Sequence, residues 1–199
     1  MTTDIEAGKV TLTIWSKDFS QMEAYRECLT KYRKETQWLL WLDIDEFFVP
    51  RYSKDVNKWI KSYEKYPSIV VWWKMFGTGG RWKHDFGKPV IEQYTISHQG
   101  YFLHRGKCFV NTDYDLAYWD DMSHHVSVVK YPILGLKLKA IPVDVYGHFS
   151  IGATILDRIL NPNRASAQIN HYWTKAWDVF EKKRRKTDVL FQRNPKKDI

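Results

Sequence analysis

The amino-acid sequence predicts an α/β fold with a mixed sheet flanked by helices. Apolar runs of strand length alternate with segments of helical periodicity, and this alternation is typical of α/β domains. The 199 residues fit one hydrophobic core, which indicates a single domain. Hydrophobic residues make up 44% of the chain, which is enough for a sizeable core and excludes the disordered class.

The first three elements are expected within the first 42 residues. Lys9–Trp15 is rich in β-branched residues and alternates, which predicts a strand. Ser20–Arg33 has apolar residues at helical spacing, and Ser20 with Glu23 fits a capping box at the start of this helix. Trp38–Leu42 is a continuous apolar run, which predicts a strand that is buried on both faces.

The rest of the chain continues the same alternation and adds short strands. An amphipathic helix that ends at a proline is followed by a second buried strand and a glycine-rich loop. Several short strands and a basic helix come later. The amphipathic helix is Lys54–Tyr66, the buried strand is Ser68–Trp73 and the glycine-rich loop is Phe76–Gly80. The short strands lie within 90–111 and 126–146, and the basic helix is Asp178–Lys186.

Composition and charge exclude several kinds of protein. The two cysteines, Cys28 and Cys108, form no CxxC pair, so neither a zinc site nor a disulfide framework is expected. No apolar run reaches membrane-spanning length and the first residues do not form a signal peptide, so we expect a cytoplasmic protein. The net charge is +8, and residues 181–199 supply +5 of it, with eight basic and three acidic side chains. No nucleic-acid-binding motif accompanies this basic end, so we expect no nucleic-acid partner.

The segment with the clearest chemistry is Trp38–Pro50, in which an apolar run is followed directly by three acidic residues. Ligands bind at the carboxyl ends of strands in open α/β sheets. In an extended chain Asp43 and Asp45 would point the same way, and Mn²⁺ or Mg²⁺ would relieve their mutual repulsion. Glu46 would support this site from behind or contact the ligand. The alternative is an acidic turn in solvent, because short acidic triplets are common.

Six short motifs resemble, in order, those of the DUF23-like glycosyltransferases, that is, family 92 and related family-2-like enzymes. Trp38–Pro50 resembles the family's W-(I/L)-x-x-(I/L)-D-(I/V)-D-E-F-(I/L/F)-x-P segment, and Gln21–Leu29 resembles its Q-x-x-A-Y-x-x-C-L helix. The other matches are Val70–Gly80 with W-x-x-F-G-S-x-G, Gly106–Val110 with K-x-I-V, His124-His125 followed by Asp144–Gly147, and Ile169–Lys182 with I-N-H-Y-x-x-K-S-x-E-E-F-x-x-K.

The resemblance implies a GT-A glycosyltransferase domain over residues 1–186, followed by a basic tail at 187–199. It implies a divalent metal, a nucleotide-sugar donor, a glycan or glycoconjugate acceptor, and inversion at the anomeric carbon. The transferred sugar would be a hexose or deoxyhexose. The family normally has another strand–helix unit before the region matching Gly8–Val10, so we expect this first unit to be missing and Lys9–Trp15 to lie beside an absent neighbour.

The same resemblance suggests roles for individual side chains. His171 would complete the metal site with Asp43 and Asp45, or contact the diphosphate, and Lys175 would neutralise the diphosphate as a point charge. Lys107 is a second candidate for binding the phosphate or the acceptor. The ordinary alternatives are a structural histidine and surface lysines.

An inverting reaction needs a carboxylate general base. The candidates are Asp120 or Asp121 first and Asp85 next. The stretch from Asp113 to His125 would form an acceptor site or a solvated loop. A non-catalytic carbohydrate-binding or scaffold protein derived from a degenerate transferase is the competing function, and Mn²⁺-dependent hydrolysis of nucleotide-sugars would discriminate between the two.

Overall fold

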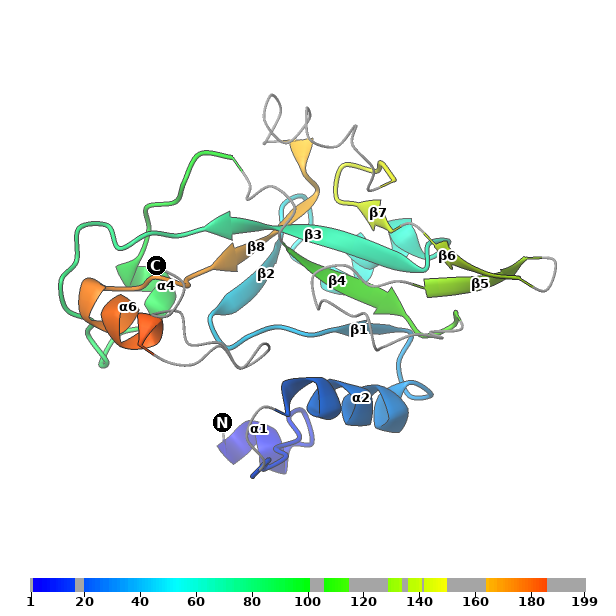
Figure 1. Ribbon diagram of the computed structural model, residues 1–199, viewed down its shortest axis with the longest axis horizontal. Helices are drawn as coiled ribbons and strands as arrows, with labels where there is room; N and C mark the ends of the chain where they lie inside the picture. Colours follow the sequence, from blue (N-terminus) through cyan, green and yellow to red (C-terminus); the bar gives the residue numbers. More distant parts are fainter. Residues whose placement is uncertain are drawn as a thin grey trace.

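The computed structural model describes residues 2–16, 20–100, 106–114, 129–133, 136–140, 142–149 and 164–185, and these form a mixed α/β structure (Figure 1). The helices are α1 (Thr2–Glu6), α2 (Gln21–Tyr32), α3 (Val56–Ile60), the 3₁₀ helix η1 (Lys61–Tyr63), α4 (Val90–Gln93) and α6 (Trp177–Arg184). The strands are β1 (Trp38–Leu40), β2 (Glu46–Pro50), β3 (Ser68–Met75), β4 (Gly106–Asn111), β5 (Val129–Ile133), β6 (Leu136–Ala140), β7 (Val143–Asp144) and β8 (Ala167–His171).

The main sheet has six strands and is mixed. Its path runs β1-β4-β3-β8-β2, and β7, which lies off this path, pairs with the first half of β3. β3 is parallel to β7 and β8, whereas the β1–β4, β3–β4 and β2–β8 pairs are antiparallel. β1 and β2 follow each other in the sequence but lie at opposite ends of this path, so the chain between them crosses one end of the sheet (Figure 1).

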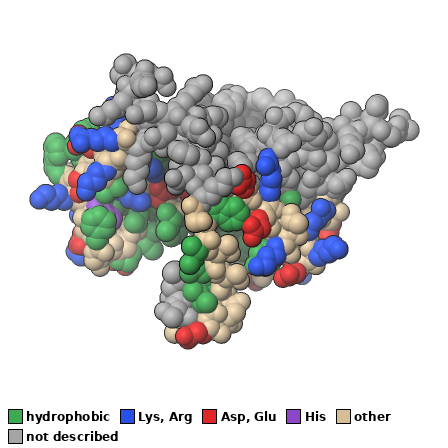
Figure 2. All heavy atoms as spheres, turned by 60° about the horizontal axis from the view of Figure 1, so that its bottom comes forward, with side chains coloured by type: hydrophobic (Ala, Val, Ile, Leu, Met, Phe, Trp, Pro, Cys, Tyr) green, Lys and Arg blue, Asp and Glu red, His purple; other side chains and the backbone are tan. Residues whose placement is uncertain are grey.

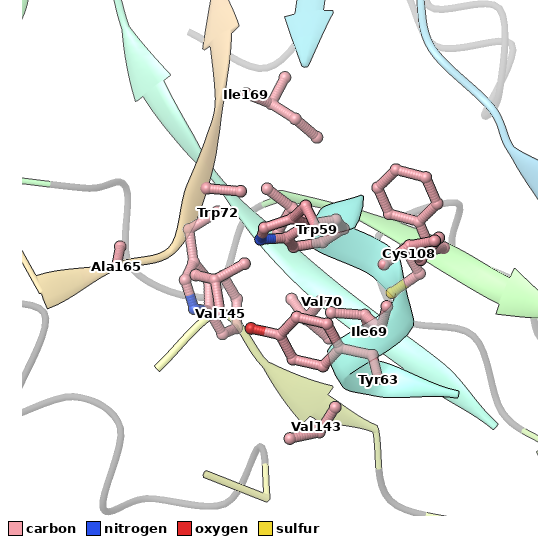
Figure 3. Packing of buried hydrophobic residues seen from close by; sticks show 14 residues of the cluster. Trp59, Tyr63, Ile69, Val70, Trp72, Cys108, Val143, Val145, Ala165 and Ile169 are labelled. Atoms are coloured by element: carbon pink, nitrogen blue, oxygen red, sulfur yellow. The ribbon is translucent and has the colours of Figure 1, made fainter. Parts of the chain in front are cut away.

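The core lies between β3, β4 and the α3–η1 segment. Trp59 and Tyr63 of that segment pack against β3, whose residues Ile69, Val70 and Val71 are fully buried (Figure 3). β4 approaches β3 so closely at Gly106 that a Cβ there would lie 2.2 Å from the carbonyl oxygen of Val71. Only glycine fits at this position, which explains why a glycine directly precedes Lys107 in this strand.

A second, smaller cluster anchors the helices near the chain's carboxyl side. Tyr94, Tyr172 and Ala176 are buried together, with Phe76 and Val90 packed against them. This cluster fixes α4 and the beginning of α6 beside the end of β8, at the left of Figure 1.

The predicted strand at Lys9–Trp15 is wrong, because these residues form neither strand nor helix. Strand backbone requires hydrogen bonds to a neighbouring strand, whereas Lys9 and Val10 donate to the carbonyl of Asp4. The side chains of this segment are exposed, and Ile14 reaches 87% exposure. Hydrophobic side chains are visible on the lobe formed by α1 and this segment at the bottom of Figure 2. The expectation that this strand flanks a missing neighbour therefore loses its premise.

The strand predicted at Trp38–Leu42 is shorter and less buried than expected. β1 covers Trp38–Leu40 and, among the described strands, pairs with β4 alone. Its side chains are half-buried because it lies at the edge of the sheet. The predictions of α2, the α3–η1 segment, β3 and α6 are confirmed. However, the side chain of Ser20 makes no capping hydrogen bond, and the 90–111 segment contains α4 as well as β4.

Two further expectations concern membrane-spanning segments and the end of the chain. In the described part of the chain, no helix combines the length and the apolar character needed to cross a membrane. The tail expected at 187–199 lies outside the described residues.

Candidate functional site

Three acidic residues lie where the chain crosses the end of the sheet: Asp43 and Asp45 in the turn before β2, and Glu46 as the first residue of β2. The backbone N–H of Glu46 donates to the carbonyl of Asp43 at 2.9 Å, and the N–H of Asp43 donates to Oε2 of Glu46 at 3.2 Å. The stretch is therefore a closed turn and not the extended segment in which Asp43 and Asp45 were expected to point the same way. In this turn Ile44 is almost fully exposed, and Asp43 and Asp45 bind separate sets of partners.

Asp43 is held by β4 and α2. Nζ of Lys107 lies 2.9 Å from Oδ2 of Asp43, and Gln21 donates to Oδ1 at 3.2 Å. Gln21 also donates to the hydroxyl of Tyr25, one helical turn further along α2. Burial and the nearby Asp43 carboxylate raise the pKa of Tyr25 to about 12, so this phenol keeps its proton at neutral pH.

Glu46 is the fully buried member of the group. Lys107, which is equally inaccessible, places its Nζ 3.5 Å from Oε2 of Glu46. Burial raises the pKa of Glu46, although the charge of Lys107 opposes this shift. Lys107 thus lies between two carboxylates, and its ammonium compensates both.

Asp45 faces the opposite side, toward β8 and α6. Nζ of Lys183 donates to Oδ2 of Asp45 at 2.9 Å, Nζ of Lys175 lies 3.8 Å from the same oxygen, and Nε2 of His171 lies 3.6 Å from Oδ1. Burial alone would raise the pKa of Asp45, but His171 and Lys183 outweigh it and hold this pKa well below its usual range. Asp45 is therefore ionised and surrounded by nitrogen atoms.

The position of His171 follows from the pairing of β8. Glu46 is the residue opposite His171 in the antiparallel β2–β8 register, and Met75 is its neighbour in β3. The ring of Trp73 packs against the imidazole, with 4.4 Å between centroids. The N–H of Phe76 donates to the carbonyl of His171, so the glycine-rich loop predicted at Phe76–Gly80 begins directly beside this histidine.

The donor types fit a divalent cation, but their present arrangement does not enclose one. Among the described residues, no three His, Cys, Asp or Glu side chains converge on a common metal position. Carboxylate oxygen and imidazole nitrogen suit Mn²⁺, and Asp45 with His171 is the pair that comes nearest. In addition, Oε1 of Glu46 and Nδ1 of His171 are buried 3.8 Å apart, and neither makes a hydrogen bond with any residue that the structure describes. Buried polar atoms without partners are rare and need an explanation, such as an ion or water.

Of the residues expected to act as general base, only Asp85 lies in the described part of the chain. Asp120 and Asp121, together with His124 and His125, lie outside the described residues. Asp85 makes local contacts instead: its Oδ1 accepts from the N–H of Gly87, and Lys88 lies 3.6 Å away.

Lys183 and the Gln21–Tyr25 pair are the contacts that the sequence analysis missed. Counting from Phe180, the last lysine of the F-x-x-K pattern falls on Lys183 and not on Lys182, so this pattern was the available signal. Gln21 and Tyr25 are the Q and Y of the Q-x-x-A-Y motif, which was noticed without a role for either side chain.

Comparison with known protein families agrees with the motifs. The family model described as glycosyltransferase family 92 matches residues 5–199, which is nearly the whole chain. A comparison with curated proteins finds no match.

Proposed function

Because the chain belongs to glycosyltransferase family 92, we propose that it moves a sugar from a nucleotide-sugar donor to a hydroxyl of a glycan or glycoconjugate acceptor. Membership implies glycosyltransferase activity. The GT-A architecture, the metal dependence, the inversion and the choice of a hexose or deoxyhexose are parts of the proposal. The observation that carries it is the convergence of carboxylates, an imidazole and ammonium groups at one end of the sheet.

The proposed metal ligands are Asp45 and His171, with Asp43 at the edge of the same site. A bound Mn²⁺ or Mg²⁺ would neutralise charge on the departing nucleoside diphosphate. Glu46 supports this arrangement from beneath, since its buried carboxylate accepts from the backbone of Asp43 and faces Nδ1 of His171. A carboxylate that accepts a hydrogen bond from the other nitrogen of a ligating histidine would fix the orientation of its ring, and Glu46 would do so if this pair closed to hydrogen-bond distance.

The two lysines predicted for the donor have different surroundings. Lys175 is partly exposed and lies near Asp45, so its ammonium is available to a diphosphate at the rim. Lys107 is fully buried between Asp43 and Glu46. We therefore propose that Lys107 positions the two carboxylates and does not touch the phosphate or the acceptor.

The proposed reaction is a single displacement. A carboxylate base removes the proton from the acceptor hydroxyl as its oxygen attacks the anomeric carbon, and the bond from that carbon to the nucleoside diphosphate breaks. Asp120 or Asp121 remains our first candidate for this base and Asp85 the next.

Ligand-dependent stability tests the proposal directly. The protein would be melted with a panel of nucleoside diphosphates and nucleotide-sugars, with and without Mn²⁺, because a ligand that binds only the native state raises the melting temperature. We expect a Mn²⁺-dependent rise and slow Mn²⁺-dependent hydrolysis of one donor. Asp45→Asn and Asp43→Asn should abolish both without unfolding the chain. Glu181→Gln, which removes an exposed carboxylate from α6, is the matched control.

Two results would count against the proposal. If no nucleotide or nucleotide-sugar stabilises the protein with or without Mn²⁺, the donor site does not exist, and a carbohydrate-binding scaffold becomes the better explanation. If Asp43→Asn and Asp45→Asn keep the Mn²⁺-dependent rise, the metal lies elsewhere.

A further inference from the structure

Lys183 forms an ion pair with Asp45, the carboxylate that we propose as a metal ligand. Its ammonium donates to Oδ2 of Asp45 at 2.9 Å, across 138 positions of sequence. This is the shortest contact of the Asp45 carboxylate among the described side chains, since Lys175 lies 3.8 Å and His171 3.6 Å away. The carboxylate proposed to bind the metal is therefore already neutralised by the protein itself.

A divalent cation and the Lys183 ammonium would compete for Asp45. Metal–oxygen bonds to Mg²⁺ are about 2.1 Å long, so an ion on either oxygen of this small carboxylate would lie close to Nζ of Lys183. Both are positive, and in a partly buried site their repulsion is only weakly screened. One of them has to move away.

The ammonium of Lys183 also lies near Trp173, which offers it a second set of contacts. Its Nζ lies 5.2 Å from the centroid of the Trp173 ring and 3.5 Å from the carbonyl oxygen of Trp173. Its side chain is 36% exposed at the rim, whereas that of Asp45 is only 8% exposed. The ammonium can therefore leave Asp45 and keep both its cation–π contact and access to water.

We infer that Lys183 is an exchangeable counterion of Asp45: it neutralises this carboxylate in the metal-free protein and withdraws toward Trp173 when the divalent cation binds. The inference rests on the proposed function, because it takes Asp45 as a metal ligand. It goes further by making metal affinity depend on a lysine that does not bind the metal.

Three lysine variants test the exchange through Mn²⁺ affinity, measured by electron paramagnetic resonance of the free ion. Lys183→Met should bind Mn²⁺ roughly two- to fivefold more tightly than the natural chain, the size expected for releasing a partly exposed ion pair. Lys183→Arg keeps the charge and a hydrogen bond to Asp45, so its affinity should not rise. Lys182→Met removes the same charge from the neighbouring, exposed position on α6 and should change the affinity by less than about twofold.

A second measurement detects the movement itself. Brief acetylation followed by peptide mass spectrometry reports how accessible each lysine is. Saturating Mn²⁺ should increase acetylation of Lys183 several-fold and leave Lys182 unchanged.

The possible failures are distinguishable. If the natural chain binds Mn²⁺ and Lys183→Met binds it equally or more weakly, or if Mn²⁺ leaves the acetylation of Lys183 unchanged, the exchange is refuted and the proposed function stands. If none of the proteins binds Mn²⁺, the metal assignment is refuted, and the exchange with it.

Discussion

Replacing Lys107 by methionine should destabilise the protein in a strongly pH-dependent way. The change leaves Glu46 buried without its compensating charge, and removing one member of a buried ion pair typically costs about 3–5 kcal/mol. Glu46 can avoid this cost by taking up a proton. With an unfolded pKa of about 4.3, protonation costs roughly 1.4 kcal/mol for each pH unit above that value, which is about 5 kcal/mol at pH 8 and about 1.6 kcal/mol at pH 5.5.

The sign of the pH dependence follows from the raised pKa. A carboxyl group whose folded pKa lies above its unfolded value stabilises the fold at low pH, and this contribution is lost as the pH rises through the folded pKa. We therefore expect Lys107→Met to lose about 3–5 kcal/mol of unfolding free energy at pH 8 and about 2 kcal/mol or less at pH 5.5. At pH 8 the melting temperature should fall by roughly 6–20 °C.

Urea unfolding in EDTA, followed by the fluorescence of the ten tryptophans, measures these values. The double variant Lys107→Met/Glu46→Gln removes both charges and should recover part of the loss at pH 8, because no buried charge is left unpaired. An equal loss at both pH values, or a double variant that is as unstable as the sum of the single variants, would refute the assigned roles of Lys107 and Glu46.

Three further predictions concern other contacts. Gly106→Ala should cost roughly 1–3 kcal/mol in thermal unfolding, because its Cβ would collide with the backbone of Val71; an unchanged melting temperature would contradict this close approach. Ser166→Ala should cost roughly 1–3 kcal/mol in urea unfolding, since Trp59 Nε1 at 3.0 Å and the Tyr63 hydroxyl at 2.7 Å lose their shared partner; a neutral effect would mean that water replaces the serine. His171→Ala and Lys175→Ala should lower turnover at least tenfold while shifting the melting temperature only slightly, with Lys182→Ala as the control, and full activity of either variant would remove that residue from the site.

The parts of the fold that could be predicted from the sequence are those with a strong local pattern. Ser68–Trp73 is a continuous apolar run and forms the buried centre of β3, and the helical spacing around Tyr25 produces α2. β8 escaped prediction because Ala-Gln-Ile-Asn-His is short and half polar. Its strand character depends on pairing with β2, about 120 positions earlier in the chain. Lys9–Trp15 failed for the opposite reason: its pattern is right for a strand, but it makes no strand pairing here.

The candidate site shows the same division. The motif around Asp43 and Asp45 pointed to these two acidic side chains, whose role as metal ligands stays a prediction. The local pattern suggested an extended segment and missed the turn closed by Glu46. The contact between Asp45 and Lys183 joins two distant segments and depends on where α6 begins. No periodicity in the sequence encodes that distance, and only the family motif offered a signal for it.

The way the chain crosses the end of the sheet also sets an order of assembly. During synthesis Asp45 and Glu46 emerge more than 120 positions before His171 and Lys183. Until that later segment has been made, β8 cannot insert between β3 and β2, and Asp45 has neither His171 nor Lys183 beside it. Contacts between distant segments form late because closing long loops costs entropy. We therefore expect β3 and β4 with α3 to fold first, and a ribosome-bound chain that stops before residue 167 to be unable to complete the site.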